Sequence, residues 1–417
     1  MRQPLHIVYI VQYFNLPDEA GGGRAYHFAR RWVELGHRVT VITGTVNHKT
    51  STVAPRFRGR LFTRETIEGI DLIRCAATTS IRRSLIGRLL NFSAFAVLSS
   101  VAALFRTDRP DIVYASSTPL TVGLPGVLGS TRWHCPFIFE VRDLWPESAV
   151  VAGILTNPLV IAAARRFERF LYRRADRVVA VTRGIRTGII EQGKRASATA
   201  LIPNGVDDLL ADRDVHDGAP AGPGRAPGAP LVCIYVGAIG MWNGNRPILD
   251  AACLLDREED IEFVLVGDGD QRPELERMAR ENGLSRVRFA GVMPKRQAVS
   301  EMLAADVCLV CTWDHPFHRM VLANKIFDYL AAGRPVIAAA RGEMADLIEQ
   351  AGAGICVPPG DAEALAGAIR TVRDLPGSER NAMGRRGREH VLAHYRRRDL
   401  ADRAERMIQD TLAGRAG

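Results

Sequence analysis

Short apolar segments rich in β-branched residues alternate with helical segments along this chain, and the alternation is interrupted once, after residue 217. The interruption is the segment 218–230, GAPAGPGRAPGAP, which contains almost nothing but Gly, Pro and Ala. Such a segment cannot fill a core and is typical of an exposed connection between domains. The length of 417 residues also predicts two or three domains. We therefore expect an N-terminal domain over 1–210, a linker over 211–230, a C-terminal domain over 231–390 and a helix over 391–417 that crosses back to the first domain.

The apolar segments predict the strands of two sheets. In the first domain they are Leu5–Val11, Arg38–Thr43, Asp71–Cys75, Asp111–Ser116, Pro136–Val141, Arg177–Thr182 and Ala200–Pro203, and in the second they are Leu231–Val236, Glu262–Val266, Val287–Gly291, Asp306–Cys311, Pro335–Ala340 and Gly354–Val357. Continuous apolar strands joined by helical crossovers indicate parallel sheets covered on both faces. The expected fold class is therefore α/β, with two doubly wound domains whose strand carboxyl ends face an interdomain cleft that holds the site.

The net charge of +9, which comes mostly from arginine, favours an anionic partner. A phosphate-bearing substrate and a lipid surface both fit, and charge alone leaves nucleic acid open. The seven cysteines are scattered through mostly apolar segments, unlike a secreted disulfide scaffold, so we expect a reducing cytoplasm. The apolar N-terminal segment Leu5–Val11 is not followed by a small-residue cleavage site, and we interpret it as a strand rather than a signal peptide.

The segment Ala323–Ala338, ANKIFDYLAAGRPVIA, predicts a helix that Asn324 caps and Gly333 ends. Lys325 and Asp328 are three residues apart in its first turns, at the helix end that attracts phosphate. A cation for a pyrophosphate and a carboxylate for ribose hydroxyls would need this placement, whereas the simpler alternative is a surface ion pair.

A Gly-Asp-Gly turn, Gly267-Asp268-Gly269, follows the predicted strand Glu262–Val266 and lets a nucleotide approach backbone amides closely. A tight turn between strand and helix is the equally good structural interpretation. Asp268 and Asp270 also form a two-carboxylate metal-binding pattern, which we discount because further oxygen ligands would be needed.

In the first domain, charged residues lie at the carboxyl end of the strand that ends at Val141. Glu140, Arg142 and Asp143 are costly at such a place unless they are paired or functional, and an Arg142 salt-bridge network that holds the loop is compatible with a functional role. A glycine-rich turn comprising Gly22, Gly23 and the following Arg24 opens the first helix, where backbone can approach a ligand or simply form a flexible loop.

Other candidate metal or redox groups lack partners in the sequence. Cys308 and Cys311 lie on a predicted strand, where residues three apart face opposite sides, so we expect core cysteines. The groups His390 with His394, and Asp314 with His315 and His318, also lack a complete ligand set, so we expect no structural metal.

The motifs together resemble the retaining glycosyltransferases of family four, which have the GT-B fold of two facing Rossmann-like domains. The resemblance covers nearly the whole chain and rests on residues 21–44, EVRDLWPES at 140–148, RRADRVVAVT at 173–182, IPNGVD at 202–207, VGDGD at 266–270 and KIFDYLAAGRPVIA at 325–338. The segment EVRDLWPES is most similar to the subgroup that adds amino or deoxyamino sugars, such as N-acetylfucosamine, in O-antigen and capsule synthesis.

The resemblance implies that the C-terminal domain binds a nucleotide diphosphate sugar and that the N-terminal domain binds the acceptor beside Gly22, Gly23 and Arg24. Lys325 matches a phosphate-facing position. Asp328 matches the second acid of the family's paired-glutamate motif, which contacts the ribose. Met320 stands at the position of the first acid, and this difference argues against the recognition of an ordinary hexose. The family's phosphate-binding Lys or Arg is also missing.

The missing cation would lie in the segment Gly240–Gly244, so Lys325 and Arg246 would have to bind the phosphates without it. The full set of donor-side residues is Lys325, Asp328, Asn324, Gly240, Asn243, Arg246, Gly267, Asp268 and Gly269, and the residues assigned to catalysis are Glu140, Arg142 and Asp143. Arg142 stands where many members of the family have a loop histidine at the acceptor side.

The expected function is thus a metal-independent, retaining transfer of an amino or deoxyamino sugar from a UDP-linked donor. We expect no cofactor and no protein nucleophile. Expected partners are the nucleotide sugar, a glycan or polyprenyl-diphosphate-linked acceptor and an anionic membrane surface, but no nucleic acid. A nonhydrolysing nucleotide-sugar epimerase of the same fold is the alternative. Two further rivals are a metal-dependent transferase that uses Asp268 and Asp270 and a noncatalytic protein that binds nucleotide sugars or acts as a membrane scaffold.

The apolar stretch Leu85–Phe105, which Arg88 and Asn91 interrupt, predicts a helix that lies on a membrane or in a core. Arginines flank it or precede it at Arg56, Arg58, Arg60, Arg64, Arg82, Arg83 and Arg88. A second basic stripe, Arg165, Arg169 and Arg173, is typical of a solvated helix face but could also contact anionic lipid. We therefore expect a cytoplasmic protein whose first domain docks on the inner face of the plasma membrane.

Overall fold

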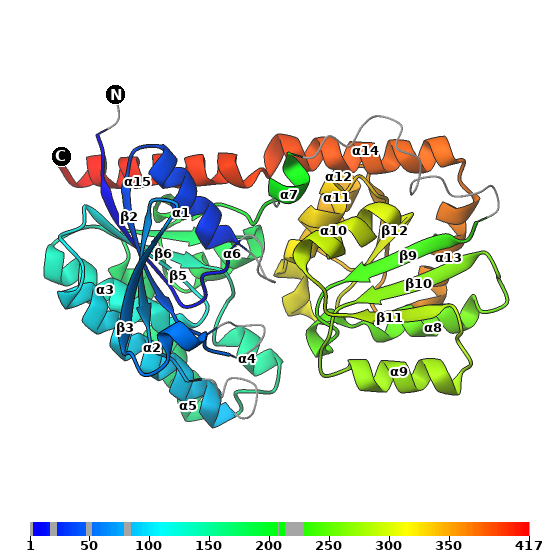
Figure 1. Ribbon diagram of the computed structural model, residues 1–417, viewed down its shortest axis with the longest axis horizontal. Coiled ribbons are helices and arrows are strands. Elements are labelled where there is room, and N and C mark those ends of the chain that lie inside the picture. Colours follow the sequence, from blue (N-terminus) through cyan, green and yellow to red (C-terminus); the bar gives the residue numbers. More distant parts are fainter. Residues whose placement is uncertain are drawn as a thin grey trace. The chain divides into compact units, whose positions relative to one another are not determined.

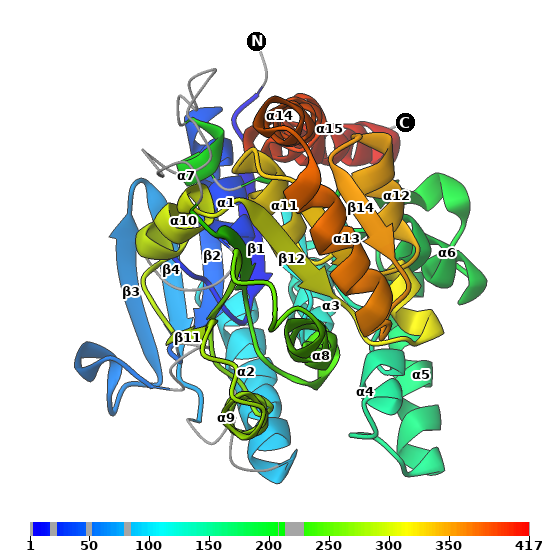
Figure 2. The same cartoon turned by 90° about the vertical axis from the view of Figure 1, so that its right-hand side faces the viewer.

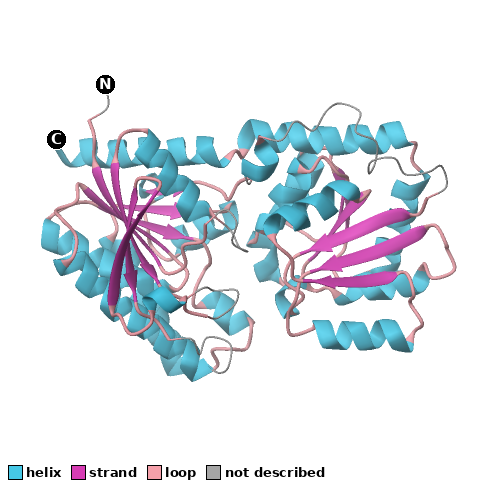
Figure 3. Cartoon of the chain, in the orientation of Figure 1, coloured by secondary structure: helices cyan, strands magenta, loops and turns pink. Residues whose placement is uncertain are grey.

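The computed structural model describes residues 3–16, 23–46, 52–78, 85–206, 208–212 and 229–416 (Figure 1). The chain forms two compact units. Unit 1 comprises Met1–Pro203 and Arg397–Gly417, and unit 2 comprises Asn204–Arg396. The expected linker therefore lies mostly outside the described residues. Both units are α/β with a largely parallel sheet, as the sequence predicts (Figure 3).

Unit 1 contains an eight-stranded sheet in the order β3-β4-β2-β1-β5-β6-β7-β8. Its strands are β1 (His6–Val11), β2 (Arg38–Gly44), β3 (Phe62–Ile67), β4 (Ile70–Cys75), β5 (Ile112–Ser116), β6 (Phe137–Val141), β7 (Arg177–Ala180) and β8 (Thr199–Leu201). Its helices are α1 (Arg24–Glu34), α2 (Leu85–Phe105), α3 (Gly123–Trp133), α4 (Glu147–Val151), α5 (Pro158–Arg174), α6 (Arg183–Glu191) and α15 (Arg397–Ala416).

Strand β3 was not predicted, and it makes the sheet mixed rather than fully parallel. It pairs antiparallel with β4 through a tight turn at Glu68 and Gly69, both of which have a positive φ. Its sequence FTRETI is half polar because the strand lies at the sheet edge, where only part of each face is covered. A search for continuous apolar runs therefore misses it.

Unit 2 contains a six-stranded, fully parallel sheet in the order β11-β10-β9-β12-β13-β14. Its strands are β9 (Leu231–Val236), β10 (Ile261–Val266), β11 (Val287–Gly291), β12 (Val307–Cys311), β13 (Val336–Ala339) and β14 (Gly354–Val357). Its helices are α7 (Asp208–Ala211), α8 (Arg246–Leu254), α9 (Arg272–Glu281), α10 (Lys295–Ala304), α11 (Asn324–Ala331), α12 (Glu343–Gln350), α13 (Ala362–Asp374) and α14 (Gly377–His394). Figure 2 shows α8, α11 and α13 of this unit in a view turned by 90° from that of Figure 1.

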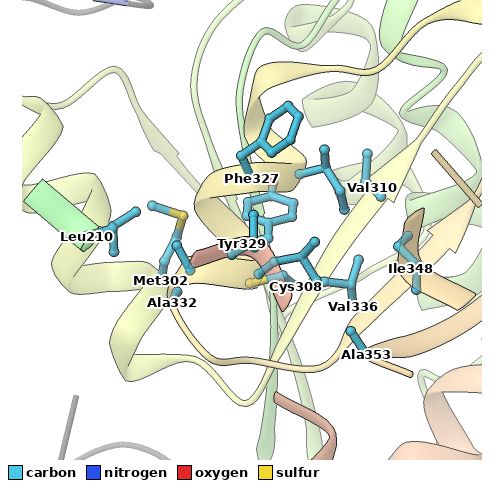
Figure 4. Close-up of a cluster of buried hydrophobic side chains, with 14 of the residues drawn as sticks. Leu210, Met302, Cys308, Val310, Phe327, Tyr329, Ala332, Val336, Ile348 and Ala353 are labelled. Atoms are coloured by element: carbon cyan, nitrogen blue, oxygen red, sulfur yellow. The ribbon is translucent and has the colours of Figure 1, made fainter. Parts of the chain in front are cut away.

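The two faces of the unit 2 sheet have separate cores. Helices α8, α9 and α13 pack on one face and α7, α10, α11, α12 and α14 on the other. Figure 4 shows the second core, where Phe327 and Tyr329 of α11 lie with Val310 and Val336 of the sheet. Because Cys308 and Cys311 are buried in opposite cores, both are core cysteines, as expected.

The unit boundaries differ from the expected 210 and 391. Leu210 of α7 is fully buried in the core of unit 2, so the chain leaves unit 1 at Pro203. Val391 also belongs to that core, and the return to unit 1 begins only at Arg397. Helix α15 then runs beside α1 (Figure 1), where Leu400 and Ile408 fill the core between that helix pair and the sheet.

Close backbone packing between α14 and the end of α11 gives a stability prediction. A Cβ on Gly384 would lie 1.9 Å from the Gly333 carbonyl oxygen, so Gly384→Ala should lower the free energy of unfolding by about 1 to 3 kcal/mol. Gly367→Ala in α13 is the matched control, because a Cβ there meets nothing within 4 Å and should stabilise by roughly 0.5 to 1 kcal/mol. Urea denaturation measures both. Equal stability of Gly384→Ala and the wild type would contradict the packing described.

Candidate functional site

The sheet of unit 2 has its topological switch point between β9 and β12. These strands are hydrogen-bonded neighbours, but the helices that follow them, α8 and α11, pack on opposite faces. The two loops therefore diverge beyond the carboxyl ends of the strands, and in open α/β sheets this is where ligands bind. The residues predicted for donor binding follow β9, β10 and β12.

Lys325, in the first turn of α11, is held over the loop that follows β9. Its Nζ donates to Asn243 Oδ1 at 2.9 Å and to the Tyr235 hydroxyl at 2.5 Å, and it lies 4.2 Å from the centre of the Tyr235 ring. The structure thus brings together Lys325 and Asn243, two of the predicted residues. Sequence reasoning missed Tyr235 because it lies inside an apolar strand, with no polar neighbour to mark it.

The glycines of this region are explained by close packing. A Cβ on Gly237 would lie 2.8 Å from Lys325 Nζ, and a Cβ on Gly267 would lie 1.8 Å from the Gly237 carbonyl oxygen. Likewise, a Cβ on Gly269 would lie 2.1 Å from the Ile239 carbonyl oxygen. The loops after β9 and β10 therefore pack backbone to backbone, and this requires the Gly-Asp-Gly turn whether or not a nucleotide contacts it.

The side chains around the Gly-Asp-Gly turn are engaged locally. Asp268 Oδ1 accepts a hydrogen bond from the Gly269 amide, and a Cβ on Gly240 would lie 2.8 Å from Asp270 Oδ1. Among the described residues, no cluster of three or more metal-ligating side chains is present. A role of Gly240, Gly267, Asp268 or Gly269 in ligand binding stays a prediction.

Asp328 is paired with Lys295 of α10. Its Oδ2 accepts from Lys295 Nζ at 2.7 Å, and only about 15% of either side chain is exposed, 14% for the acid and 16% for the lysine. Within the described part of the chain, Asp328 Oδ1 is buried and has no hydrogen-bond partner. Sequence reasoning missed Lys295, which is remote from Asp328 in the sequence.

Two other predicted donor-side residues lie at helix starts. Asn324 is the first residue of α11 rather than its cap, since Ala323 holds the N-cap position and makes no side-chain hydrogen bond; the predicted cap is wrong. The preceding residues turn the chain so that Asn324 already has helical geometry. Arg246, the first residue of α8, is exposed and lies 3.6 Å from Asp250.

Aromatic and imidazole rings form the surface next to Asn243. Trp242 lies 5.2 Å from His318, and Trp313 stacks on His315 with ring centres 5.4 Å apart. Burial lowers the pKa of His318, and nearby His315 lowers it further, so the imidazole is neutral at pH 7. The sequence analysis grouped these histidines as weak metal ligands, whereas the structure places them in a ring cluster.

In unit 1, the carboxylate of Glu140 is completely buried at the end of β6. Arg24 Nη2 donates to Glu140 Oε2 at 2.9 Å, and the hydroxyls of Tyr114 and Ser116 donate at 2.8 and 2.7 Å. Burial alone raises the pKa of Glu140, but the charge and hydrogen bond of Arg24 outweigh it, and the pKa lies below its ordinary value. Glu140 is therefore ionised and bound to Arg24, not to Arg142.

Arg24 also donates to backbone carbonyls of the chain that leaves β8. Its Nη1 and Nη2 bond to the carbonyl oxygens of Pro203 and Ile202 at 2.5 and 3.0 Å. This buried guanidinium holds α1, β6 and residues 202–203 together, so it is placed to support the structure. Of the neighbouring glycines predicted on the acceptor side, Gly23 is the N-cap residue of α1 and Gly22 lies outside the described residues.

Arg142 and Asp143 follow β6 and are only partly exposed. The Arg142 amide donates to the Ser117 hydroxyl at 3.1 Å, while its side-chain Nε is buried and has no hydrogen-bond partner among the described residues. Burial lowers the pKa of Arg142 although Glu140 opposes this, and burial raises the pKa of Asp143. Their catalytic role stays a prediction.

A cavity of about 680 Å³ opens at the carboxyl ends of β2 and β4 in unit 1. Arg58 and Arg60 line it together with the apolar side chains of Phe57 and Leu61. The sequence analysis assigned these arginines to a membrane flank, but the structure places them around a hollow that combines positive charge with apolar surface.

Two models of protein families match the chain. The model described as a glycosyl transferase 4-like domain matches residues 21–205, and the model described as glycosyl transferases group 1 matches residues 230–374. Together they span most of the chain. The chain belongs to the family-four glycosyltransferases. The match confirms the family expected from the sequence motifs.

Individual glycosyltransferases of known sequence or structure are also similar to this chain. WcaI of Escherichia coli (strain K12), named for glycosyl transfer in colanic acid biosynthesis, is 27% identical over 400 residues, covering 93% of this chain and 96% of WcaI. The sucrose-phosphate synthase of Thermosynechococcus elongatus has a similar structure with a TM-score of 0.72 and 20% identity, covering 98% of this chain and 100% of that one. HepE of Anabaena, crystallised with UDP, gives a TM-score of 0.69 at 18% identity, covering 97% and 100%. The GT-B fold expected from the resemblance is thus confirmed.

The Arg24–Glu140 pair gives a prediction for this glycosyltransferase. Glu140→Gln leaves the buried guanidinium without its counter-charge and should lower the free energy of unfolding by about 3 to 5 kcal/mol. Glu34→Gln removes a partly exposed partner of Arg30 and Arg31, and it should lower the free energy of unfolding by less than about 1 kcal/mol. Urea denaturation at pH 7 followed by circular dichroism compares the two. If both variants lost the same small amount, the buried pair would not be the support described here.

Proposed function

We propose that the protein transfers an amino or deoxyamino sugar from a nucleotide diphosphate sugar, UDP being the favoured nucleotide, with retention of anomeric configuration. The observation that carries the proposal is the ammonium of Lys325, positioned by Tyr235 and Asn243 at the switch point of the unit 2 sheet. A fixed cation at this place stabilises the charge that develops on a leaving pyrophosphate, because it needs no reorganisation during the reaction.

The nucleotide part of the donor would be held by groups around α11. Asp328 Oδ2 is occupied by Lys295, so Oδ1 is the oxygen that we assign to a ribose hydroxyl. Arg246 and Asn243 complete the polar surface on the opposite loop. The arrangement supports a diphosphate bound at Lys325 with its ribose toward α10 and α11.

The sugar preference follows from the loop after β12. Met320 stands where the paired-glutamate motif has its first acid, and it offers no carboxylate to a sugar hydroxyl. Trp242, Trp313 and His318 add ring surface nearby. An apolar environment favours a sugar with fewer hydroxyls, such as a deoxyamino sugar, over an ordinary hexose.

The acceptor would bind unit 1. We propose a glycan or a polyprenyl-diphosphate-linked sugar as the acceptor, in cell-surface polysaccharide synthesis at the cytoplasmic side of the membrane. The relative WcaI is named for glycosyl transfer in colanic acid biosynthesis. The cavity lined by Arg58, Arg60 and Phe57 has the charge and the apolar surface that a lipid diphosphate requires. A nonhydrolysing epimerase, the alternative from the sequence, is not favoured by the two glycosyl transferase models.

In the transfer itself, a donor phosphate oxygen would accept the proton of the attacking acceptor hydroxyl on the same face of the sugar. The glycosidic bond to the acceptor forms as the bond to the leaving nucleoside diphosphate breaks, and no covalent enzyme intermediate is required. Arg142 and Asp143 would position the acceptor hydroxyl from the end of β6.

The donor site is tested by removing the Lys325 ammonium. Lys325→Ala should weaken UDP binding by roughly 1.5 to 3 kcal/mol, the range for hydrogen bonds to charged groups, in isothermal titration calorimetry. Arg277→Ala, at an exposed pair with Glu281 on α9, is the matched loss of positive charge in the same unit and should leave UDP affinity unchanged. UDP affinity that Lys325→Ala does not alter would reject Lys325 as the phosphate contact.

Metal independence is tested by ligand removal. Turnover with the preferred donor should persist in excess EDTA, because the cationic charge at the leaving phosphate is assigned to Lys325 rather than to a bound ion. The measurement is nucleotide release before and after dialysis against chelator. Loss of activity that Mg²⁺ or Mn²⁺ restores would show that the transfer uses a metal.

A further inference from the structure

Helix α2 of unit 1 is predominantly apolar but is not fully enclosed. Its segment Gly87–Phe105 is long and apolar enough to cross a membrane, with a mean hydropathy of 1.6, yet only 39% of it is buried. The inner side packs in the unit through residues such as Phe95 and Ala102. On the outer side, Leu90 is 57% exposed and Val97 is 61% exposed. A helix of a soluble core would carry polar residues on that outer side.

Helix α5 also exposes large apolar side chains. Leu159 is 80% exposed, Val160 is exposed at the next position, and Phe170 projects farther along the helix. Phe170 stacks on Phe167 with ring centres 6.3 Å apart, which fixes it as part of a small aromatic ridge. Two separate helices of unit 1 therefore leave apolar side chains in water.

Both helices lie on the same face of the unit 1 sheet. The connections β4–α2–β5, β5–α3–β6 and β6–α5–β7 cross the sheet in one direction, and right-handed crossovers of this kind put their helices on one face. Helix α3 packs between its neighbours at glycine contacts: a Cβ on Gly129 would lie 3.2 Å from Ala103 Cβ of α2, and one on Gly123 would lie 2.5 Å from Leu171 of α5. The small residues of α3 let both neighbours pack closely against it, so α2, α3 and α5 form one layer on this face.

The charges on this layer have one sign. The sequence of α2 contains Arg88 and no acidic residue, and that of α5 contains five arginines and one acid, Glu168. Glu168 is buried and accepts a hydrogen bond from Tyr172, so its carboxylate does not face outward. Arg165 is paired with Glu147, whereas Arg166, Arg169 and Arg173 are exposed along α5.

We propose that the outer surface of α2 and α5 is a docking face for an anionic lipid bilayer. Exposed apolar side chains enter the interface between head groups and acyl chains, and the arginines beside them bind anionic head groups. A second copy of the chain fits less well, because a two-fold contact would bring arginines of the same face toward one another. The assignment is independent of the donor site, which lies in the other unit.

Vesicle sedimentation of the full chain tests the docking face. Wild-type protein should pellet with vesicles that contain about 30% phosphatidylglycerol, and much less with phosphatidylcholine alone or at 1 M salt, where charge attraction is screened. The variants Val97→Ser/Phe105→Ser and Arg166→Gln/Arg173→Gln should each lower the vesicle partition coefficient at least about tenfold. The matched control Val292→Ser/Arg277→Gln, which changes an exposed apolar residue and an exposed arginine of unit 2, should bind vesicles like the wild type.

Parallel measurements separate docking from folding and from the proposed transfer. Circular dichroism and UDP affinity should be unchanged in all variants, since none of the altered residues contacts the donor site. Wild-type protein that stays in the supernatant with anionic vesicles would overturn the proposal. So would a dimer in analytical ultracentrifugation that both docking-face variants dissociate, because a second copy would then cover the surface.

Discussion

The contact of Lys325 with Tyr235 and Asn243 places a fixed cation at the switch point of unit 2. A lysine side chain alone is flexible, but here the phenol and the amide oxygen fix its ammonium above the loop after β9. Gly237 is required because a Cβ there would collide with that ammonium, and Gly267 is required because Gly237 lies against it. The position of the Lys325 ammonium thus accounts for Gly237 in the loop after β9 and, through Gly237, for Gly267 in the loop after β10.

Unit 1 depends in a similar way on a buried ion pair. Arg24 connects α1 to Glu140 on β6 and to the carbonyl groups of residues 202–203, so the position of three separate segments follows from one guanidinium. Such a pair adds little stability compared with apolar residues but is costly to break, and it fixes a single arrangement of the segments. The predicted acceptor-side loop after β6 is built on this support.

The sequence predicts the fold well because buried parallel strands are continuous apolar runs, and it misses β3 because an edge strand carries polar residues. It assigns Lys325 and Asn243 to the same donor-side group, and the folded chain brings these two side chains into contact. It cannot predict the Lys295–Asp328 or Arg24–Glu140 pairs, since these join residues that only the folded chain brings together. Asn324 is misplaced by one residue, because cap positions depend on local backbone angles rather than on residue type alone.

The central claim is that a nucleoside diphosphate binds at the switch point of unit 2 with its phosphates at Lys325. A crystal structure of the protein with UDP tests it directly. We expect a phosphate oxygen about 2.7 to 2.9 Å from Lys325 Nζ, beside Asn243, with the ribose toward Asp328. UDP bound elsewhere, with the ammonium still bonded to Tyr235 and Asn243 and to no phosphate oxygen, would contradict it.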